Sequence, residues 1–193
     1  MSDYLDYDGQ TLTWMPGGLT YRATSGLRGA QTPSKQCSPD EGPIPEGTYY
    51  LLLRMDRQEY AKDDGTSRCK LRPGSAIQFI PRGGDPNVAP KGDQAGECED
   101  PYWANWGWRR VRLEAADRAT VTACFPRRGG FYLHDSSKGY SHGCIEVEQP
   151  FFNQLLSFVK KTTQTRMLLR VAYTKPSTYG GTLNPSAKAP SGR

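Results

Sequence analysis

Glycine and proline interrupt this chain so often that only short regular segments fit between them. The 193 residues include 21 glycines and 15 prolines, a share well above the roughly 12% of average usage. Short segments of alternating polar and apolar residues between such turns are typical of a β domain. We therefore expect a mainly β fold, in a chain long enough to bury a sizeable core.

Strands are expected where apolar and β-branched residues gather between the turns, over residues 12–14, 19–21, 48–54, 76–80, 111–113, 120–124, 131–133 and 167–173. One helix is expected over residues 149–161, because Pro150 suits a first helical position and large apolar residues follow at helical spacing. Residues 1–175 are interpreted as one domain, and the Pro/Gly/Ser-rich residues 176–193 as a flexible tail.

Two classes of protein are excluded by composition and charge. No apolar run approaches the roughly 18 residues that cross a bilayer, and the mean hydropathy is −0.71. We expect no membrane span. The 25 Lys and Arg residues exceed the 20 Asp and Glu residues by 5, but they are scattered. Because they form neither a basic stripe nor a recognised binding module, we expect no nucleic-acid partner.

The cysteines indicate the redox environment in which the protein works. There are five, at positions 37, 69, 98, 124 and 144. None forms a C-x-x-C pair, and an odd count indicates two disulfides plus one free thiol in an oxidising environment. Four cysteines allow three pairings, which stay open here, as does the alternative that all five are reduced and buried. The N-terminal residues lack the basic and apolar regions of a secretory signal. The chain is thus expected to be a mature fragment or the cargo of a machine that needs no cleavable signal.

The chemistry concentrates in one segment that contains both histidines of the chain. His134 follows the apolar residues 131–133, and Ser141-His142-Gly143-Cys144 closes the loop ten residues later. An imidazole can take the proton of a thiol and hold the thiolate as an ion pair. Backbone N–H groups near Gly143 and Cys144 could then stabilise an oxyanion. This pattern indicates acyl transfer with Cys144 as nucleophile and His134 as base.

Two competing interpretations of these residues stay open. The histidines could be a satisfied core pair, or they could bind zinc with Cys144. Zinc requires a fourth ligand, for which Asp135 is the local candidate. We expect no metal and no cofactor.

The segment resembles the active-site signature of YkuD-type L,D-transpeptidase catalytic domains, which carry a histidine, a spacer and Ser/Thr-His-Gly-Cys. The turn and strand entry Gly42-Pro43-Ile44-Pro45-Glu46-Gly47-Thr48-Tyr49 is similar to a second feature of those domains. The resemblance covers residues 40–175. It implies a disulfide-stapled β-sandwich with one helix next to the active site.

The resemblance also implies an activity. The enzyme would cleave the peptidoglycan stem tetrapeptide before its terminal D-Ala and form an acyl-enzyme on Cys144. Water would release it by L,D-carboxypeptidation, and the amine of a D-amino acid acceptor by exchange or transpeptidation. By motif position His134 is the base, and Asp135 takes the place of the residue that orients this histidine, often by its main-chain carbonyl. Ser141, His142 and Gly143 shape the oxyanion side.

Two departures from the family pattern narrow the resemblance. The spacer before Cys144 is short, and Glu146 stands where Asn or Arg is common. Both argue against efficient cross-linking, and the compact spacer looks more like L,D-transpeptidase effectors of type VI secretion. Such an effector would be made in the bacterial cytoplasm without a cleavable signal. It would act as an antibacterial toxin in the periplasm of a target cell, with a cognate immunity protein as partner.

Other hypotheses use the same residues differently. The aromatic residues Tyr102, Trp103, Trp106 and Trp108 could stack on sugars in a non-catalytic cell-wall binding module, or they could fill the core and support the wall of the site. A cysteine endopeptidase that cuts peptide bridges is a third possibility. Arg109 and Arg110 could bind substrate carboxylates or form a plain surface pair.

Overall fold

The computed structural model describes residues 2–54, 77–80 and 106–184. Its strands are β1 Tyr4–Tyr7, β2 Thr11–Met15, β3 Leu19–Ser25, β4 Gly47–Leu52, β5 Ile77–Phe79, β6 Arg109–Ala115, β7 Tyr132–His134, β8 Ile145–Val147 and β9 Arg166–Val171. Its helices are the 3-10 turn η1 Pro33–Lys35, α2 Arg118–Val121 and α3 Pro150–Val159. The predicted mainly β fold is confirmed.

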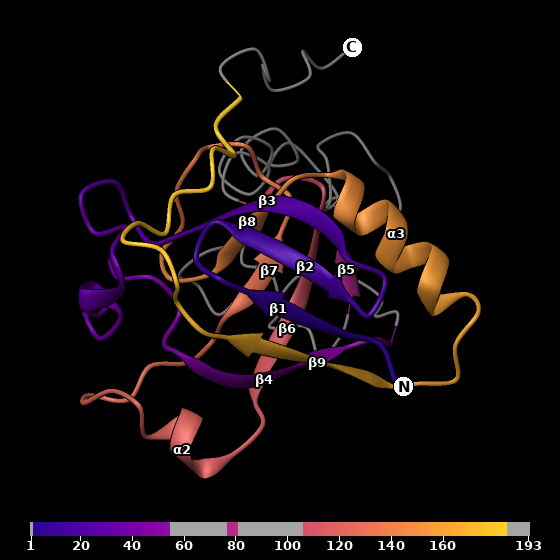
Figure 1. Ribbon diagram of the computed structural model, residues 1–193, viewed down its shortest axis with the longest axis horizontal. Coiled ribbons are helices and arrows are strands. Elements are labelled where there is room, and N and C mark those ends of the chain that lie inside the picture. Colours follow the sequence, from indigo (N-terminus) through magenta and orange to yellow (C-terminus); the bar gives the residue numbers. More distant parts are fainter. Residues whose placement is uncertain (1, 55–76, 81–105, 185–193) are drawn as a thin grey trace, which may run out of the picture.

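The strands form a closed sheet (Figure 1). In the described residues the order is β4-β9-β1-β2-β3-β8-β7-β6, and pairing of β4 with β6 closes the ring, with β5 added outside β6. Strand β3 pairs with β2 through its first residues and with β8 through its last, and β6 pairs with β7 and then with β4. The two layers of the predicted sandwich are therefore joined into one barrel. Neighbours are antiparallel except β1 with β9 and β7 with β8.

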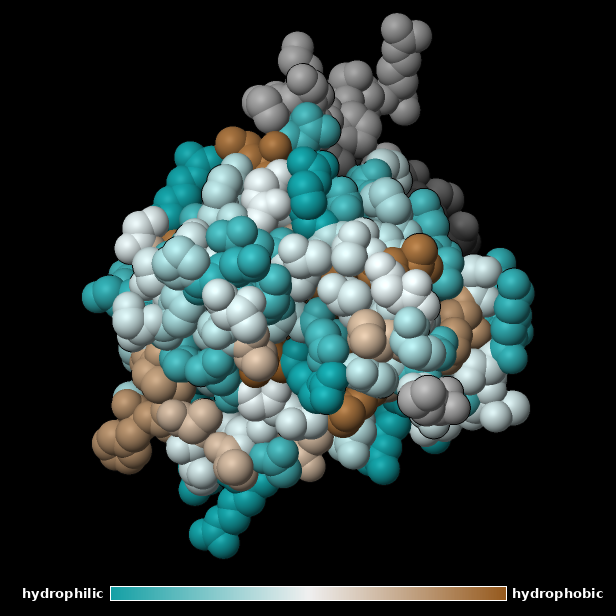
Figure 2. All heavy atoms as spheres, in the orientation of Figure 1, coloured by the Kyte–Doolittle hydropathy of each residue, from teal (hydrophilic) through white to brown (hydrophobic). Residues whose placement is uncertain are grey.

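The core forms because strand alternation sends apolar side chains inward. Leu12 and Trp14 of β2 are buried while their neighbours are partly exposed. Helix α3 lies along one side of the barrel (Figure 1), with Phe151 edge-on to Tyr21 at 5.4 Å between ring centroids. Figure 2 shows a face of mostly hydrophilic and neutral residues with scattered apolar ones, as expected for a molecule that keeps its apolar side chains inside.

Two local predictions differ from the structure. Residues 120–124 were expected to form a strand, but the chain turns into α2 because the Asp117 side chain caps the helix by accepting the Thr120 N–H at 2.7 Å. The tail over residues 176–193 was expected to be flexible, and residues 185–193 of it lie outside the described residues. Residues 177–184 instead pack on the barrel, where Thr178 is buried and its carbonyl accepts the Ser25 N–H at 3.0 Å.

The expected disulfides are found in part. Cys37 and Cys124 are joined, and Cys144 carries a free, buried thiol. Cys69 and Cys98 lie outside the described residues. No helix in the described ranges is long and apolar enough to cross a membrane.

Candidate active site

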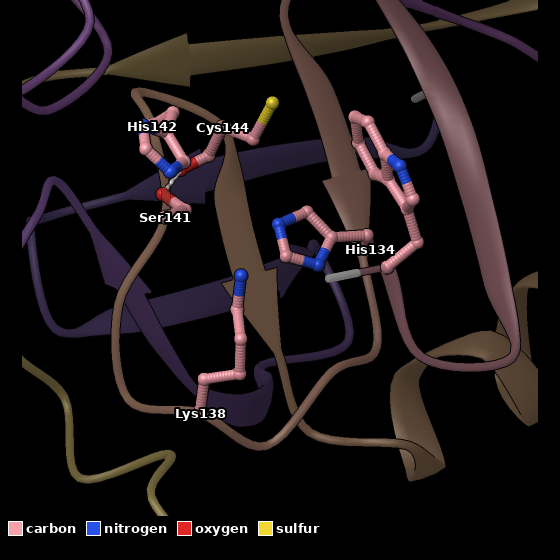
Figure 3. A pocket seen from close by; sticks show the side chains of 6 residues that line it. His134, Lys138, Ser141, His142 and Cys144 are labelled. Atoms are coloured by element: carbon pink, nitrogen blue, oxygen red, sulfur yellow. Dashed lines mark hydrogen bonds between the residues drawn. The ribbon is translucent and has the colours of Figure 1, made fainter. Parts of the chain in front are cut away.

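A pocket of about 190 Å³ collects the residues of the predicted signature (Figure 3). It is lined by Trp106, His134, Lys138, Ser141, His142 and Cys144. The parallel pairing of β7 with β8 produces it: β7 ends at His134 and β8 begins just after Cys144, with His134 opposite Glu146 in register. The register therefore puts Cys144 beside Tyr132, two residues before His134 along β7, with the side chains of Cys144 and His134 on the same face of the sheet.

Cys144 is held as a protonated thiol. Its Sγ accepts the backbone N–H of Tyr132 at 3.3 Å, and the residue is 8% exposed. Burial raises the pKa of the thiol, and the Tyr132 N–H and the charges of Arg110, Lys138 and Arg112 offset this increase only in part. The thiol is therefore held in place, and its burial favours the protonated form.

His134 is held as a neutral imidazole. Burial lowers its pKa well below the usual value, and the charges of Lys138 and Arg110 lower it further, against a hydrogen bond with the Trp106 backbone. Its Nδ1 lies 3.1 Å from the Ser136 hydroxyl, and its ring is edge-on to Trp106. A neutral ring near physiological pH can accept a proton, as a general base must.

The structure favours a neutral pair over the expected thiolate–imidazolium pair. The hydrogen bonds of the described residues include none between Cys144 and His134. Figure 3 shows the ring projecting into the pocket toward the Lys138 side chain, while the sulfur points away from the ring. Because burial disfavours both charged forms, the two groups rest as a neutral pair in one pocket.

The Asp135 side chain bonds to Trp108 and Arg109 and not to His134, so the orienting role expected by motif position stays a prediction for its main chain. Its Oδ1 accepts the N–H groups of Trp108 at 2.6 Å and Arg109 at 2.8 Å, and its Oδ2 accepts Arg109 Nε at 2.8 Å. Side chains of successive extended residues point to opposite faces, so the residue after His134 is turned away from it. Burial raises the pKa of Asp135, and its bonds with Arg109 act in the opposite direction.

The Arg109 guanidinium is paired with the Asp135 carboxylate and also contacts helix α3. Its Nη1 donates to the Asn153 side chain of α3 at 2.9 Å. The Asp135 carboxyl, considered as a fourth zinc ligand, therefore faces a guanidinium. The described residues contain no group of three or more His, Cys, Asp and Glu that could hold a metal.

Ser136 is a functional candidate that the sequence analysis missed, and Glu146 is one that it noted only as a departure from the family pattern. The Ser136 hydroxyl lies next to His134 Nδ1 and also donates to Glu146 Oε2. Glu146 has no exposed surface although it lies between two buried aliphatic residues of β8. A carboxylate in an apolar strand was the available signal, since buried charges need partners.

The three residues expected on the oxyanion side have different environments. The Ser141 hydroxyl donates to the Cys144 carbonyl, so it holds the loop closed. His142 is exposed at the pocket and its Nδ1 lies 3.1 Å from the Asp40 carbonyl. Gly143 has φ of +99°, a conformation that favours glycine.

Arg128 packs against the loop that carries Gly143, and the sequence analysis did not single it out. Its Nη2 donates to the Gly42 carbonyl at 3.0 Å and its Nη1 to the carbonyls of Gln36 and Pro43. A Cβ on Gly143 would lie 2.3 Å from Nη2, so the guanidinium packs directly on that glycine. The Cys37–Cys124 disulfide joins the two segments that Arg128 bridges.

Basic side chains surround the thiol. Lys138 reaches into the pocket (Figure 3), and burial lowers its pKa against the charges of Glu146 and Cys144. Arg110 is 3% exposed, with its guanidinium 4.5 Å from the ring centroids of both Trp106 and Tyr132 and its Nε donating to Gln78. The site therefore favours an anionic ligand over a neutral one.

The aromatic residues divide between two places. Trp106 forms a wall of the pocket, and Trp108 is 37% exposed beside Phe79 in a second hollow lined also by Arg109 and Gln149. Tyr102 and Trp103 lie outside the described residues.

Comparison with known protein families identifies a match over most of the chain. The family model described as the Tlde1 domain matches residues 20–171, which include every strand from β4 to β9 and the whole pocket. No curated protein matches the chain.

Proposed function

This chain belongs to the Tlde1 domain family, a type VI secretion effector family similar to L,D-transpeptidases, and we propose that it cleaves peptidoglycan stem tetrapeptides through an acyl-enzyme on Cys144. One observation carries the proposal: a free cysteine and a neutral histidine line the same pocket. A buried thiol without a partner base would be inert.

The reaction begins when substrate fills the pocket. His134 accepts the Cys144 proton as Sγ attacks the carbonyl carbon before the terminal D-Ala, forming the S–C bond. The Tyr132 N–H, already on the sulfur, favours the developing thiolate. Collapse of the tetrahedral intermediate breaks the C–N bond, and the imidazolium returns its proton to the departing amine.

Deacylation follows the same path in reverse. Water attacks the thioester to give the shortened peptide, or the amine of a D-amino acid attacks to give an exchanged peptide. His134 takes the proton of the attacking group and passes it to the departing sulfur. The backbone N–H groups of Gly143 and Cys144 are the proposed oxyanion donors. The Ser25 and Ser141 hydroxyls support their placement by holding the Cys144 carbonyl.

Lys138 favours removal of a terminal residue over cleavage inside a bridge. Its ammonium lines the pocket beside the thiol, where the carboxylate of the departing D-Ala is to be bound. In a peptide bridge that carboxylate is consumed in an amide, and the ammonium would lose its partner. Carboxypeptidation and exchange thus fit the charges of the site better than endopeptidase activity.

The test is a digest of purified tetrapeptide muropeptides, resolved by mass, with and without a free D-amino acid. Loss of one terminal D-Ala and its replacement are the expected products, and Cys144→Ala should form neither. Intact tetrapeptides after incubation with the wild-type protein would refute the proposal, and cut cross-links would indicate the endopeptidase. Equal sacculus binding by both proteins without release would support a binding module.

The place of action is part of the same proposal. A type VI effector with this activity works in the periplasm of a target cell after being made in the producer's cytoplasm. The Cys37–Cys124 disulfide suits an oxidising compartment. A producer exposed to such an enzyme requires an immunity protein, and co-purification of a neighbouring gene product with the Cys144→Ala protein would identify it.

A further inference from the structure

We propose that Glu146 is a positioning residue that acts through Ser136 to keep the Nε2 of His134 unprotonated and available to the thiol. This inference rests on the proposed function, since it concerns the same base. It assigns a role to the residue that departs from the L,D-transpeptidase pattern.

Glu146 behaves as a full acceptor. Its Oε1 accepts the Gly139 N–H at 2.7 Å and the Thr182 hydroxyl at 2.5 Å. Its Oε2 accepts the Lys138 N–H at 3.0 Å and the Ser136 hydroxyl. Four donors on two oxygens match the acceptor capacity of an ionised carboxylate, which has no proton to give back.

The proton count at Ser136 then determines the tautomer. A hydroxyl has one hydrogen, and the Ser136 hydrogen is used on Glu146. Toward His134 Nδ1, 3.1 Å away, the same oxygen can only accept. Nδ1 therefore carries the hydrogen and Nε2 holds the free electron pair.

The strand register supports this arrangement. It places Glu146 opposite His134 in the parallel pair, so both side chains lie on the same face of the sheet. Ser136 fills the space between them.

The C-terminal segment completes the arrangement. Thr182 is buried, and its hydroxyl donates to Glu146 and lies 2.9 Å from the Thr24 hydroxyl. The Asn184 N–H donates to the Ser137 carbonyl at 3.0 Å, beside Ser136. The segment taken for a loose tail thus shields Glu146 from water and holds the loop that carries Ser136.

Glu146→Gln is the informative variant because it keeps the shape and removes the charge. The new amide can donate to the Ser136 oxygen, which then turns its own hydrogen toward Nδ1. This favours the Nε2–H form, which cannot accept the thiol proton. Where a corresponding change creates the wrong tautomer in a serine protease triad, kcat falls about 10⁴-fold.

The first measurement is the ¹⁵N NMR spectrum of His134, in protein that carries His142→Asn so that one histidine remains. The Nδ1–H tautomer is expected with Glu146, and a population of the Nε2–H form with Glu146→Gln. Glu148→Gln is the matched control, because Glu148 pairs with Arg22 outside the pocket. The Nε2–H form in protein that retains Glu146, or an unchanged tautomer in Glu146→Gln, would overturn the proposal whether or not tetrapeptides are cleaved.

The second measurement is a double-mutant cycle on tetrapeptide cleavage. Glu146→Gln alone should lower kcat about 10²–10⁴-fold with little change in KM. In a Ser136→Ala background, the fold decrease in kcat caused by Glu146→Gln should be at least ten times smaller. The hydroxyl that joins Glu146 to His134 is already absent there. Independent, multiplying effects would mean that Glu146 only supports the fold and would overturn the proposal. If Glu146→Gln fails to fold, the spectrum and kcat of Ser136→Ala decide: unchanged kcat overturns it, and reduced kcat at constant KM supports it.

Discussion

Asp135 Oδ2 and Arg109 Nε lie 2.8 Å apart, and this pair, not a contact with His134, is what the side chain of the residue after the histidine contributes. The pair fixes the start of β6 and, through Asn153, the N-terminal half of α3. The helix is connected to the pocket by this buried carboxylate.

Removing that carboxylate should therefore destabilise the fold more than it changes the chemistry. Breaking one side of a buried ion pair typically costs about 3–5 kcal/mol, so Asp135→Ala should lower the free energy of unfolding by about that amount. Urea denaturation followed by fluorescence measures it. Asp6→Ala, which removes an exposed partner of Arg170, is the control and should cost below about 1 kcal/mol. Equal losses in the two variants would contradict the structural role of Asp135.

The reactivity of Cys144 should follow its raised pKa. Burial keeps the thiol protonated at neutral pH, and the thiolate is the species that reacts with iodoacetamide. The alkylation rate, followed by mass, should rise only as pH passes above the usual range of cysteine. In contrast, cleavage of tetrapeptide should already proceed near neutral pH, because neutral His134 removes the proton during attack. Full alkylation at pH 6 would instead indicate a preformed ion pair.

Lys138→Met should impair recognition of a free carboxylate. The variant keeps an unbranched side chain that is one atom shorter and removes the ammonium from the pocket. KM for tetrapeptide should rise about 10-fold or more, as for loss of a charged hydrogen-bond partner of about 1.5–3 kcal/mol. A tetrapeptide amidated at its terminal D-Ala should bind the wild type and the variant alike. An equal rise in KM for both substrates would remove Lys138 from carboxylate recognition.

The Cys37–Cys124 bridge should contribute strongly to stability. It closes a loop with a sequence separation of 87 residues, for which chain entropy gives about 4–5 kcal/mol. In a Cys144→Ala background, Cys37→Ser/Cys124→Ser should lower the urea midpoint of the oxidised protein. The control is to add a reductant to both proteins. The reductant should lower the urea midpoint of the Cys144→Ala parent much more than that of the variant without this bridge. A midpoint unaffected by removing the bridge would contradict the expectation.

Sequence patterns predicted much of the fold because they reflect local physics. Alternation gave the strands 12–14 and 19–21, and the spacing of apolar residues gave the helix within two residues of its ends. The strand predicted over residues 120–124 was wrong. The β-branched residues there favour a strand, but the Asp117 side chain caps a helix that begins at Arg118. The prediction of a flexible tail was wrong for its described part, residues 177–184. The small polar residues there make side-chain and backbone hydrogen bonds to distant strands, which composition does not reveal.

The sequence predicted that His134 and Cys144 would share one site, which the pocket confirms, but not which residues support them. Their catalytic roles stay a prediction. His134 and Cys144 stand out because they are close in sequence and chemically unusual. Ser136, Glu146 and Arg128 act through partners fixed by the parallel register and by the loop at Gly42. Asp135 was assigned by position alone, and strand alternation sends its side chain the other way. Contacts across strands require the register, which a single sequence does not provide.

The hydroxyl of Thr182 on Glu146 has a consequence for biosynthesis. A growing polypeptide contains Cys144 and His134 before residue 182 is added, so the proposed nucleophile and base exist for a time without the segment that encloses Glu146. Translation must pass this threonine before the pocket acquires its final hydrogen bonds. A product that stopped short of it would carry both reacting side chains and still leave the carboxylate open to water.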